Sequence, residues 1–255
     1  MTILLRRYML LFLASVARVF ARRPRVTVLL YHSVSREPWR YAVAPGDFRR
    51  QMEYAAAHAD MVPLARVLAH TKGEPLMRDA VAVTFDDVYV DFYGEALPVL
   101  TDLNIPVTVF ASLREADRRE LDVAFPLLSE GAYTLPAHVE VGSHALTHRK
   151  LSRLAPEEVR RELDESAQRL HERFGTRPRF VAYPKGSYSP AVMEAAKECG
   201  YEGAFTTLPR SVAAKDYPFA LPRVQVDATT SFGEFRARLT AAADWYCALR
   251  RHLHI

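Results

Sequence analysis

The chain has 255 residues, of which 49% are hydrophobic and 25% charged, with 10 glycines and 16 prolines. These proportions exclude a disordered, collagenous or low-complexity chain, and the length suits one large α/β domain. The 2 cysteines, Cys199 and Cys247, exclude a disulfide-stapled scaffold, because a single pair outside any CxxC makes no such framework.

The positive charge of the chain is concentrated near its start. The formal net charge is +4, and no acidic residue precedes Glu37. The first 25 residues carry Arg6, Arg7, Arg18, Arg22, Arg23 and Arg25. Because no basic stripe with interleaved aromatic residues runs through the domain, the asymmetry favours an anionic membrane surface over nucleic acid as a partner.

Residues 1–24 are predicted to form a basic amphipathic helix close to a membrane. The uncharged run Tyr8–Ala17 is half of the roughly 20 residues that a membrane-spanning helix needs, so we expect no simple span. We predict a helix that lies on a membrane surface. An export signal to the cell envelope and a plain helix packed on the domain are the alternatives. A helical stripe would carry Arg7, Leu11, Ser15, Arg18, Arg22 and Arg25, with apolar residues filling much of the rest.

From residue 25 to residue 255 the pattern predicts one α/β domain. Short apolar runs rich in β-branched residues alternate with helical stretches, as in a parallel sheet. The predicted strands are Val26–Tyr31, Ala80–Phe85, Val107–Ala111, His138–Gly142, Arg179–Tyr183, Gly203–Thr206 and Leu221–Val226. The predicted helices are Asp47–Ala59, Val88–Leu103, Pro156–Phe174, Pro190–Cys199 and Gly233–Leu249. About seven parallel strands indicate a barrel or its remnant.

Polar side chains gather at the ends of four of these strands. They are Asp86 and Asp87, then His144 and His148, then His32, and finally Arg223 near the start of the last strand. In parallel sheets such ends carry the reactive groups, and one carboxylate with two imidazoles is a ligand set of hydrolytic zinc centres. Each signal alone has a structural explanation, such as a helix cap for the acidic pair or a chance His-x3-His spacing. Their coincidence favours a metal site.

Three segments resemble, in order and spacing, the polysaccharide deacetylase family, which is also called the NodB-homology family or carbohydrate esterase family four. They read VAVTFDDVYVDFYGEALPVL, VGSHALTHRKLSRL and RFVAYPKGSYSPAVMEAAKECGY, and the similarity runs from about Val26 to Asp227. The resemblance implies a distorted (β/α) barrel. It also implies an enzyme that hydrolyses N-acetyl groups of amino sugars with a divalent metal, usually Zn²⁺.

The resemblance also implies roles for individual residues. Asp87, His144 and His148 match the metal ligands, and Asp86 matches the general base that deprotonates the attacking water. The backbone N–H of Lys185, in AYPKG, matches the donor that stabilises the oxyanion.

Three departures from the family pattern change other positions. Val88 stands where the family has glycine after the acidic pair. Ala182 stands where an arginine usually steadies the base, and we expect Arg223 to replace it. The usual C-terminal L-x-H is absent. As in the circularly permuted branch of the family, His32 in LLYHSV is then expected to be the acid that protonates the leaving amine.

These observations predict a metal-dependent N-deacetylase that acts on a polysaccharide or oligosaccharide near a membrane. One alternative keeps the chemistry but takes a lipid-linked sugar, with an acetyl or a formyl leaving group. Another alternative is a glycan-binding pseudoenzyme, suggested by the changes at Val88 and Ala182. No nucleic-acid partner is expected.

Overall fold

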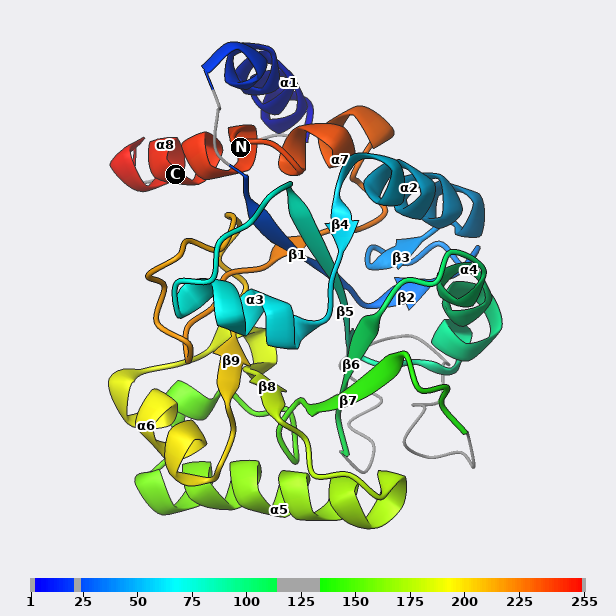
Figure 1. The fold of residues 1–255 in the computed structure, drawn as a ribbon. Coiled ribbons are helices and arrows are strands. Elements are labelled where there is room, and N and C mark those ends of the chain that lie inside the picture. The colour runs from blue at the N-terminus through cyan, green and yellow to red at the C-terminus, as the bar shows by residue number, and fades with distance from the viewer. Residues whose placement is uncertain (1–2, 21–23, 114–133, 254–255) are drawn as a thin grey trace.

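The computed structural model describes residues 3–20, 24–113 and 134–253 (Figure 1). Its helices are α1 (Ile3–Phe20), α2 (Pro45–His58), α3 (Leu64–Thr71), α4 (Leu97–Asp102), α5 (Pro156–Phe174), α6 (Pro190–Glu198), α7 (Phe232–Arg238) and α8 (Ala242–Leu253). Its strands are β1 (Val26–Tyr31), β2 (Ser33–Val34), β3 (Ala42–Val43), β4 (Asp60–Met61), β5 (Ala80–Asp87), β6 (Val107–Ala111), β7 (Val139–Ser143), β8 (Phe180–Ala182), β9 (Gly203–Phe205) and β10 (Val224–Gln225).

Seven parallel strands form one curled sheet in the order β10-β1-β5-β6-β7-β8-β9. The segment before β10 turns back to the opposite edge, where Leu221 makes a parallel bridge to Phe205 of β9. The same short segment therefore contacts both edges of the sheet, β9 through Leu221 and β1 through β10. The predicted distorted (β/α) barrel in a single domain, with a helix at its N-terminal end, is confirmed.

The central strands β1 and β5 are buried along their whole length. This agrees with their nearly continuous apolar sequences, because a parallel strand covered on both faces has no polar side to present. Helix α5 begins with Pro156, whose missing N–H wastes no hydrogen bond in the first turn. It ends at Gly175, whose φ of 74° suits a left-handed C-cap.

Two predicted helices are wrong in their extent. Residues 88–103 do not form one helix, because Asp87 and Val88 adopt left-handed φ values of 62° and 58°. A π-helix starts only at Phe92 and leads into α4. The predicted helix Gly233–Leu249 is divided into α7 and α8, and the Thr240 hydroxyl between them accepts the backbone N–H of Ala242.

The remaining differences are smaller. Helix α3 was not predicted, although Leu64, Val67 and Leu68 place a short apolar face against the barrel. The last predicted strand, Leu221–Val226, is reduced to β10. Pro222 lies within it and has no N–H for the ladder. The other predicted strands and helices match the observed ones to within two residues at each end, and β1, β6 and α5 have the predicted bounds.

Helix α1 packs on the barrel across α7 and α8 (Figure 1). Its buried side, Leu10 and Ala14, lies against Ala237, Ala242 and Tyr246. Of the predicted stripe, Leu11 and Ser15 are exposed, but Arg7 turns toward the barrel. Arg6 and Arg7 both pair with the fully buried carboxylate of Glu234. The exposed large side chains of α1 are apolar: Ile3, Leu4, Leu5, Tyr8, Leu11 and Phe12.

The side chains of Arg18, Arg22 and Arg23 lie outside the described residues. Within the described ranges, no helix combines the length and the apolar character that a membrane crossing requires. The division at residue 24 stays a prediction.

Candidate active site

The register of three neighbouring strands brings the polar strand ends together. Asp87 at the end of β5 is level with Ala111 of β6, and Ala111 is level with Ser143 of β7. His144 follows Ser143 directly, so it projects from the same end of the curled sheet as Asp87. The carboxyl ends of parallel strands share one edge, which is where α/β proteins place their reactive groups.

Asp87, His144 and His148 form a group that can hold a metal ion. One ligand atom from each lies within 4.8 Å of the others. Asp87 Oδ1 is 3.6 Å from His148 Nε2, and the two imidazole rings have centroids 5.0 Å apart. His144 Nδ1 lies 2.8 Å from the carbonyl oxygen of Ala182, which can only accept a hydrogen bond, so Nε2 is left as the ligand atom. One carboxylate and two oriented imidazoles fit a divalent metal.

A buried carboxylate outside the predicted set holds the loop that carries His148. Glu162 of α5 accepts the backbone N–H of Leu146 at 3.1 Å and that of Thr147 at 2.8 Å, and it also bonds the Thr147 hydroxyl. The loop needs this support because Ala145 and His148 have left-handed φ values of 59° each.

Asp86 lies beside the three metal-ligand candidates and accepts two hydrogen bonds from Arg223. The fully buried guanidinium donates to both carboxylate oxygens, at 2.6 and 2.7 Å. It is itself oriented by Thr84 Oγ1 and by the carbonyl oxygen of Thr206. Burial alone would raise the pKa of Asp86, but the charge of Arg223, with smaller contributions from His144 and His32, lowers it to about 2. The carboxylate is therefore ionised at neutral pH, as a general base must be.

The contact between Arg223 and Asp86 is the one expected if Arg223 replaces the arginine missing at Ala182. The roles of both residues in a reaction stay predictions.

His32 lies at the end of β1 and within electrostatic reach of the two acidic residues. Burial lowers the pKa of its imidazole, while the carboxylates of Asp86 and Asp87 oppose that shift. Its ring packs on Tyr41 with centroids 4.8 Å apart. Among the described residues, its buried Nδ1 has no hydrogen-bond partner. The structure thus places His32 near the carboxylates with one ring nitrogen unsatisfied.

The turn that contains Lys185 follows β8 as a short 3-10 segment, Pro184–Gly186. Lys185 has a φ of 57° and an exposed side chain, so what it could offer to the site is its backbone. Gly186 follows with a φ of 64°, and a Cβ there would lie 2.2 Å from the Thr207 hydroxyl. Glycine suits this position because any side chain would be strained by the left-handed φ and by the nearby Thr207.

Val88 keeps the turn that glycine makes in the family pattern. Its φ of 58° is unusual for a β-branched residue, and its side chain is fully buried. The backbone N–H of Val88 donates to the carbonyl oxygen of Asp86 at 2.7 Å. Packing therefore holds Val88 in the left-handed conformation, and the substitution does not move Asp87 out of the metal-ligand group.

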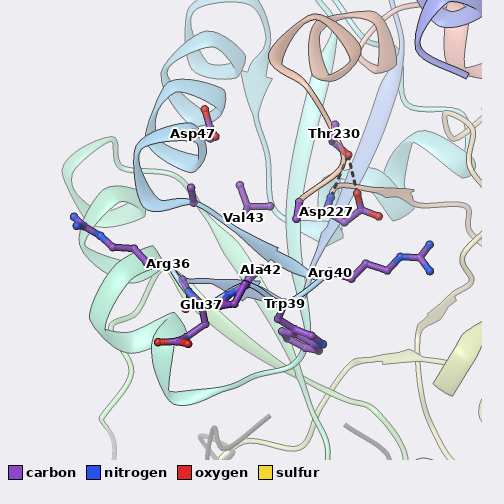
Figure 2. Close-up of a pocket in the computed structure, with 13 residues that line it drawn as sticks. Arg36, Glu37, Trp39, Arg40, Ala42, Val43, Asp47, Asp227 and Thr230 are labelled. Carbon is purple, nitrogen blue, oxygen red and sulfur yellow. Dashed lines mark hydrogen bonds between the residues drawn. The ribbon is translucent and has the colours of Figure 1, made fainter. Parts of the chain in front are cut away.

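A cavity of about 400 Å³ adjoins the loop that follows His32 (Figure 2). Its lining includes Trp39, whose ring meets Tyr41 and Tyr89 edge-on with centroids 5.4 and 5.2 Å away. Tyr41 packs on His32, and the Tyr89 hydroxyl donates to Asp87 Oδ2 at 3.3 Å. Aromatic rings thus connect this cavity to the site, a link that was not predicted from sequence.

Sequence reasoning missed Glu162, although the sequence carries a signal for it. Val159, Leu163 and Leu170 mark the apolar stripe of α5, and Glu162 lies on that same stripe. A carboxylate on the buried face of an amphipathic helix needs a partner there. No comparable signal exists for Trp39, because its contacts come from separate loops.

Comparisons with known proteins agree with this geometry. A family model described as "Polysaccharide deacetylase" matches residues 73–204. The Bacillus subtilis (strain 168) protein YxkH is 26% identical over 216 residues, which are 84% of this chain and 75% of the relative. A Staphylococcus epidermidis poly-beta-1,6-N-acetyl-D-glucosamine N-deacetylase is 23% identical over 224 residues, which are 82% of this chain and 76% of the relative.

A similar fold occurs among solved structures. The Streptococcus pyogenes deacetylase PplD, determined in complex with acetate, superimposes with a TM-score of 0.71 at 20% identity. The match covers 86% of this chain and 99% of that one.

Proposed function

Because the chain belongs to the polysaccharide deacetylase family, whose members are hydrolases of carbon–nitrogen bonds in carbohydrates, we propose that it removes N-acetyl groups from a polymer of N-acetylglucosamine. The observation that carries the proposal is the grouping of Asp87, His144 and His148 within 4.8 Å beside the ionised, arginine-bound Asp86. The substrate class follows from the relative that acts on poly-β-1,6-N-acetylglucosamine.

The steps of the reaction are assigned to residues at the ends of β1, β5, β7 and β8 and to Arg223, which precedes β10. A divalent metal held by Asp87, His144 and His148 would polarise the acetyl carbonyl and lower the pKa of water. Asp86 takes a proton from the attacking water while Arg223 keeps its carboxylate aligned. The backbone N–H of Lys185 donates to the carbonyl oxygen as negative charge develops there. His32 gives a proton to the sugar nitrogen, the carbon–nitrogen bond breaks, and acetate and the amine are released.

We infer Zn²⁺ as the metal. Two imidazoles and one carboxylate are a ligand set of catalytic zinc sites, which keep a further position open. Hard cations such as Mg²⁺ prefer oxygen ligands alone. His32 follows β1, which precedes β5 with its acidic pair in the chain, and this order supports the circularly permuted branch of the family.

Two variants test the roles of base and ligand. We expect Asp86→Asn to retain the metal and to lower acetate release from N-acetylglucosamine oligomers about 100- to 10,000-fold, because it removes a general base. His144→Ala should lose metal and activity together. Exposed His58→Ala is the matched control and should change neither quantity. Full activity of Asp86→Asn, or a metal content of His144→Ala equal to that of the wild type, contradicts the proposal.

The same assay separates the alternatives. Release of formate instead of acetate indicates a deformylase. Activity on lipid extracts alone indicates a lipid-linked sugar as substrate. Bound zinc without any hydrolysis indicates a pseudoenzyme, although the complete group of metal-ligand candidates counts against that alternative.

We propose further that the chain works at a membrane surface, with α1 as the contact. The support is the outward apolar face of α1, where Tyr8 is 63% and Phe12 68% exposed. Aromatic and leucine side chains on one helix face suit the interface between headgroups and acyl chains. We expect Phe12→Ser to reduce binding to phospholipid vesicles. Met77→Ser removes an even more exposed apolar residue elsewhere and is the control. Equal vesicle binding by wild type and Phe12→Ser contradicts membrane contact.

A further inference from the structure

A second cavity, of about 220 Å³, lies between α1 and the barrel, outside the candidate active site. Its lining includes residues of α1, β10, α7 and α8 and of the loops near them. They are Arg6, Leu10, Arg40, Thr207, Pro209, Val224, Gln225, Asp227, Arg238, Ala243 and Tyr246. The volume exceeds by several-fold the roughly 30 Å³ that one water occupies, so a small hydrated group has room.

The lining of this cavity carries an excess of positive charge. It contains three arginines, Arg6, Arg40 and Arg238, and one carboxylate, that of Asp227. The oxygens of Asp227 already accept hydrogen bonds from Thr229, Thr230 and Gln225, one of which Figure 2 shows. Because three guanidinium groups face one carboxylate, the lining itself has an excess of two positive charges.

The arginines of the cavity have fewer carboxylate partners than positive charges. Arg6 pairs with the buried Glu234 at 3.0 Å, but Arg7 contacts the same carboxylate, so the two arginines share one negative charge. Arg238 donates to the backbone carbonyl of Gln225 and, among the described residues, makes no ion pair. Burial and the neighbouring charge of Arg6 lower the pKa of Arg238, although the carboxylates of Glu234 and Asp227 oppose that shift. Like charges held close together in a part-buried cavity favour an anion between them.

We propose that this cavity binds a phosphate group through Arg6, Arg40 and Arg238. Guanidinium groups recognise phosphate oxygens in pairs and hold them by charge-assisted hydrogen bonds. The shared chemistry is the phosphate itself, and its source is either a phospholipid or lipid-linked headgroup or a soluble phosphate. The exposed apolar face of α1, on the helix that lines the cavity, favours the lipid source.

The test uses the full chain and a pair of variants in one loop. Arg40 and Arg36 are both exposed and point in opposite directions in Figure 2, and only Arg40 lines this cavity. We expect Arg40→Gln to weaken the binding of inorganic phosphate or diphosphate about 10-fold in calorimetric titrations at constant ionic strength. Arg36→Gln should bind as the wild type does. Asp86→Asn should also bind phosphate normally, which separates this inference from the deacetylase proposal.

A second titration identifies the source of the phosphate. Vesicles of phosphatidylcholine with and without phosphatidylglycerol replace the soluble anion. If a lipid headgroup occupies the cavity, Arg40→Gln and Phe12→Ser both reduce binding to the vesicles that contain phosphatidylglycerol. If a soluble phosphate occupies the cavity, Arg40→Gln weakens the binding of the soluble anion but does not change binding to the vesicles that contain phosphatidylglycerol. Phe12→Ser then has no effect on the binding of the soluble anion. Absence of saturable binding in both titrations, or equal losses in Arg40→Gln and Arg36→Gln, overturns the proposal.

Discussion

The buried pair of Asp86 and Arg223 shows how single residues set the chemistry of the site. Two parallel hydrogen bonds of 2.6 and 2.7 Å orient the carboxylate and keep it ionised despite its burial. Lysine carries the same charge but cannot donate in this forked geometry. We therefore expect Arg223 to be a positioning residue that acts on the reaction through Asp86.

We expect Arg223→Lys to lower kcat for acetate release about 10- to 100-fold, because Asp86 loses its alignment while substrate binding is untouched. KM should stay near the wild-type value. Arg223→Met is a harsher change. It leaves the Asp86 carboxylate buried without its partner, so its free energy of unfolding should fall by about 3–5 kcal/mol. Kinetics with chemical denaturation of both variants check this prediction, and a raised KM with unchanged kcat would contradict it.

Asp91 is the residue from which we expect a pH effect on stability. Burial raises the pKa of its carboxyl from 3.8 to about 6, although hydrogen bonds from Ser33 and backbone N–H groups oppose the shift. The folded state therefore holds this proton more tightly than the unfolded state. The stability that the proton contributes is complete below pH 3.8 and is lost as the pH rises through about 6.

We expect Asp91→Asn to remove this fall in the free energy of unfolding between about pH 4 and pH 6. Urea denaturation across that range compares the slopes of wild type and variant. Asp47→Asn, at an exposed carboxylate, is the control and should keep the wild-type slope. Identical slopes for wild type and Asp91→Asn would refute the assignment.

Among the helices, α5 packs on the sheet and also holds a loop of the candidate site. Its buried Glu162 caps two backbone N–H groups of the loop between His144 and His148. The sequence predicts the boundaries of α5 well, because Pro156 and Gly175 mark its ends. It does not predict which loop Glu162 meets, since that loop belongs to another part of the chain.

We expect Glu162→Gln to weaken metal binding about 10-fold, because the loop that carries His148 loses a charged acceptor. The free energy of unfolding should also fall by about 1–3 kcal/mol. Glu157→Gln, at an exposed position in the first turn of the same helix, is the control. Competition with a metal-chelating dye measures the affinity. An unchanged metal affinity in Glu162→Gln would show that the loop holds its shape without this carboxylate.

Helix α1 illustrates a second limit of sequence patterns. The helix is amphipathic, but apolar residues lie on both of its sides: Leu10 and Ala14 pack on α7 and α8, while Tyr8 and Phe12 face solvent. The buried Glu234 of α7 draws Arg6 and Arg7 to the barrel side. Hydrophobic periodicity reports that a helix has two faces, and the charges of its neighbours decide which face turns inward.

At the scale of the molecule, the curl of the sheet assembles the site from distant segments. Asp87 and His148 come from β5 and from the loop after β7, and a metal between them would tie these segments together in the folded state only. A ligand that binds only the folded state stabilises it, by about 2.7 kcal/mol when free metal is 100 times its Kd.

We therefore expect a chelator to lower the melting temperature of the wild type. His148→Ala should melt near the temperature of the chelated wild type and should not respond to the chelator. Differential scanning calorimetry with and without added Zn²⁺ checks this. A melting temperature of the wild type that ignores both chelator and zinc would argue against a metal in this group.

The local spacing of residues in the sequence was enough to identify the alternating strands and helices, the family and the three metal-ligand candidates. Those features depend on neighbours along the chain, where strand ends and short motifs keep their chemistry together. Only the tertiary structure decided that Arg223 meets Asp86 across 137 positions, that Glu162 holds the His148 loop, and that Arg6 and Arg7 of α1 turn toward Glu234. Each of these contacts gives a buried carboxylate its hydrogen-bond donors, and the partner of a buried charge is chosen by proximity in space.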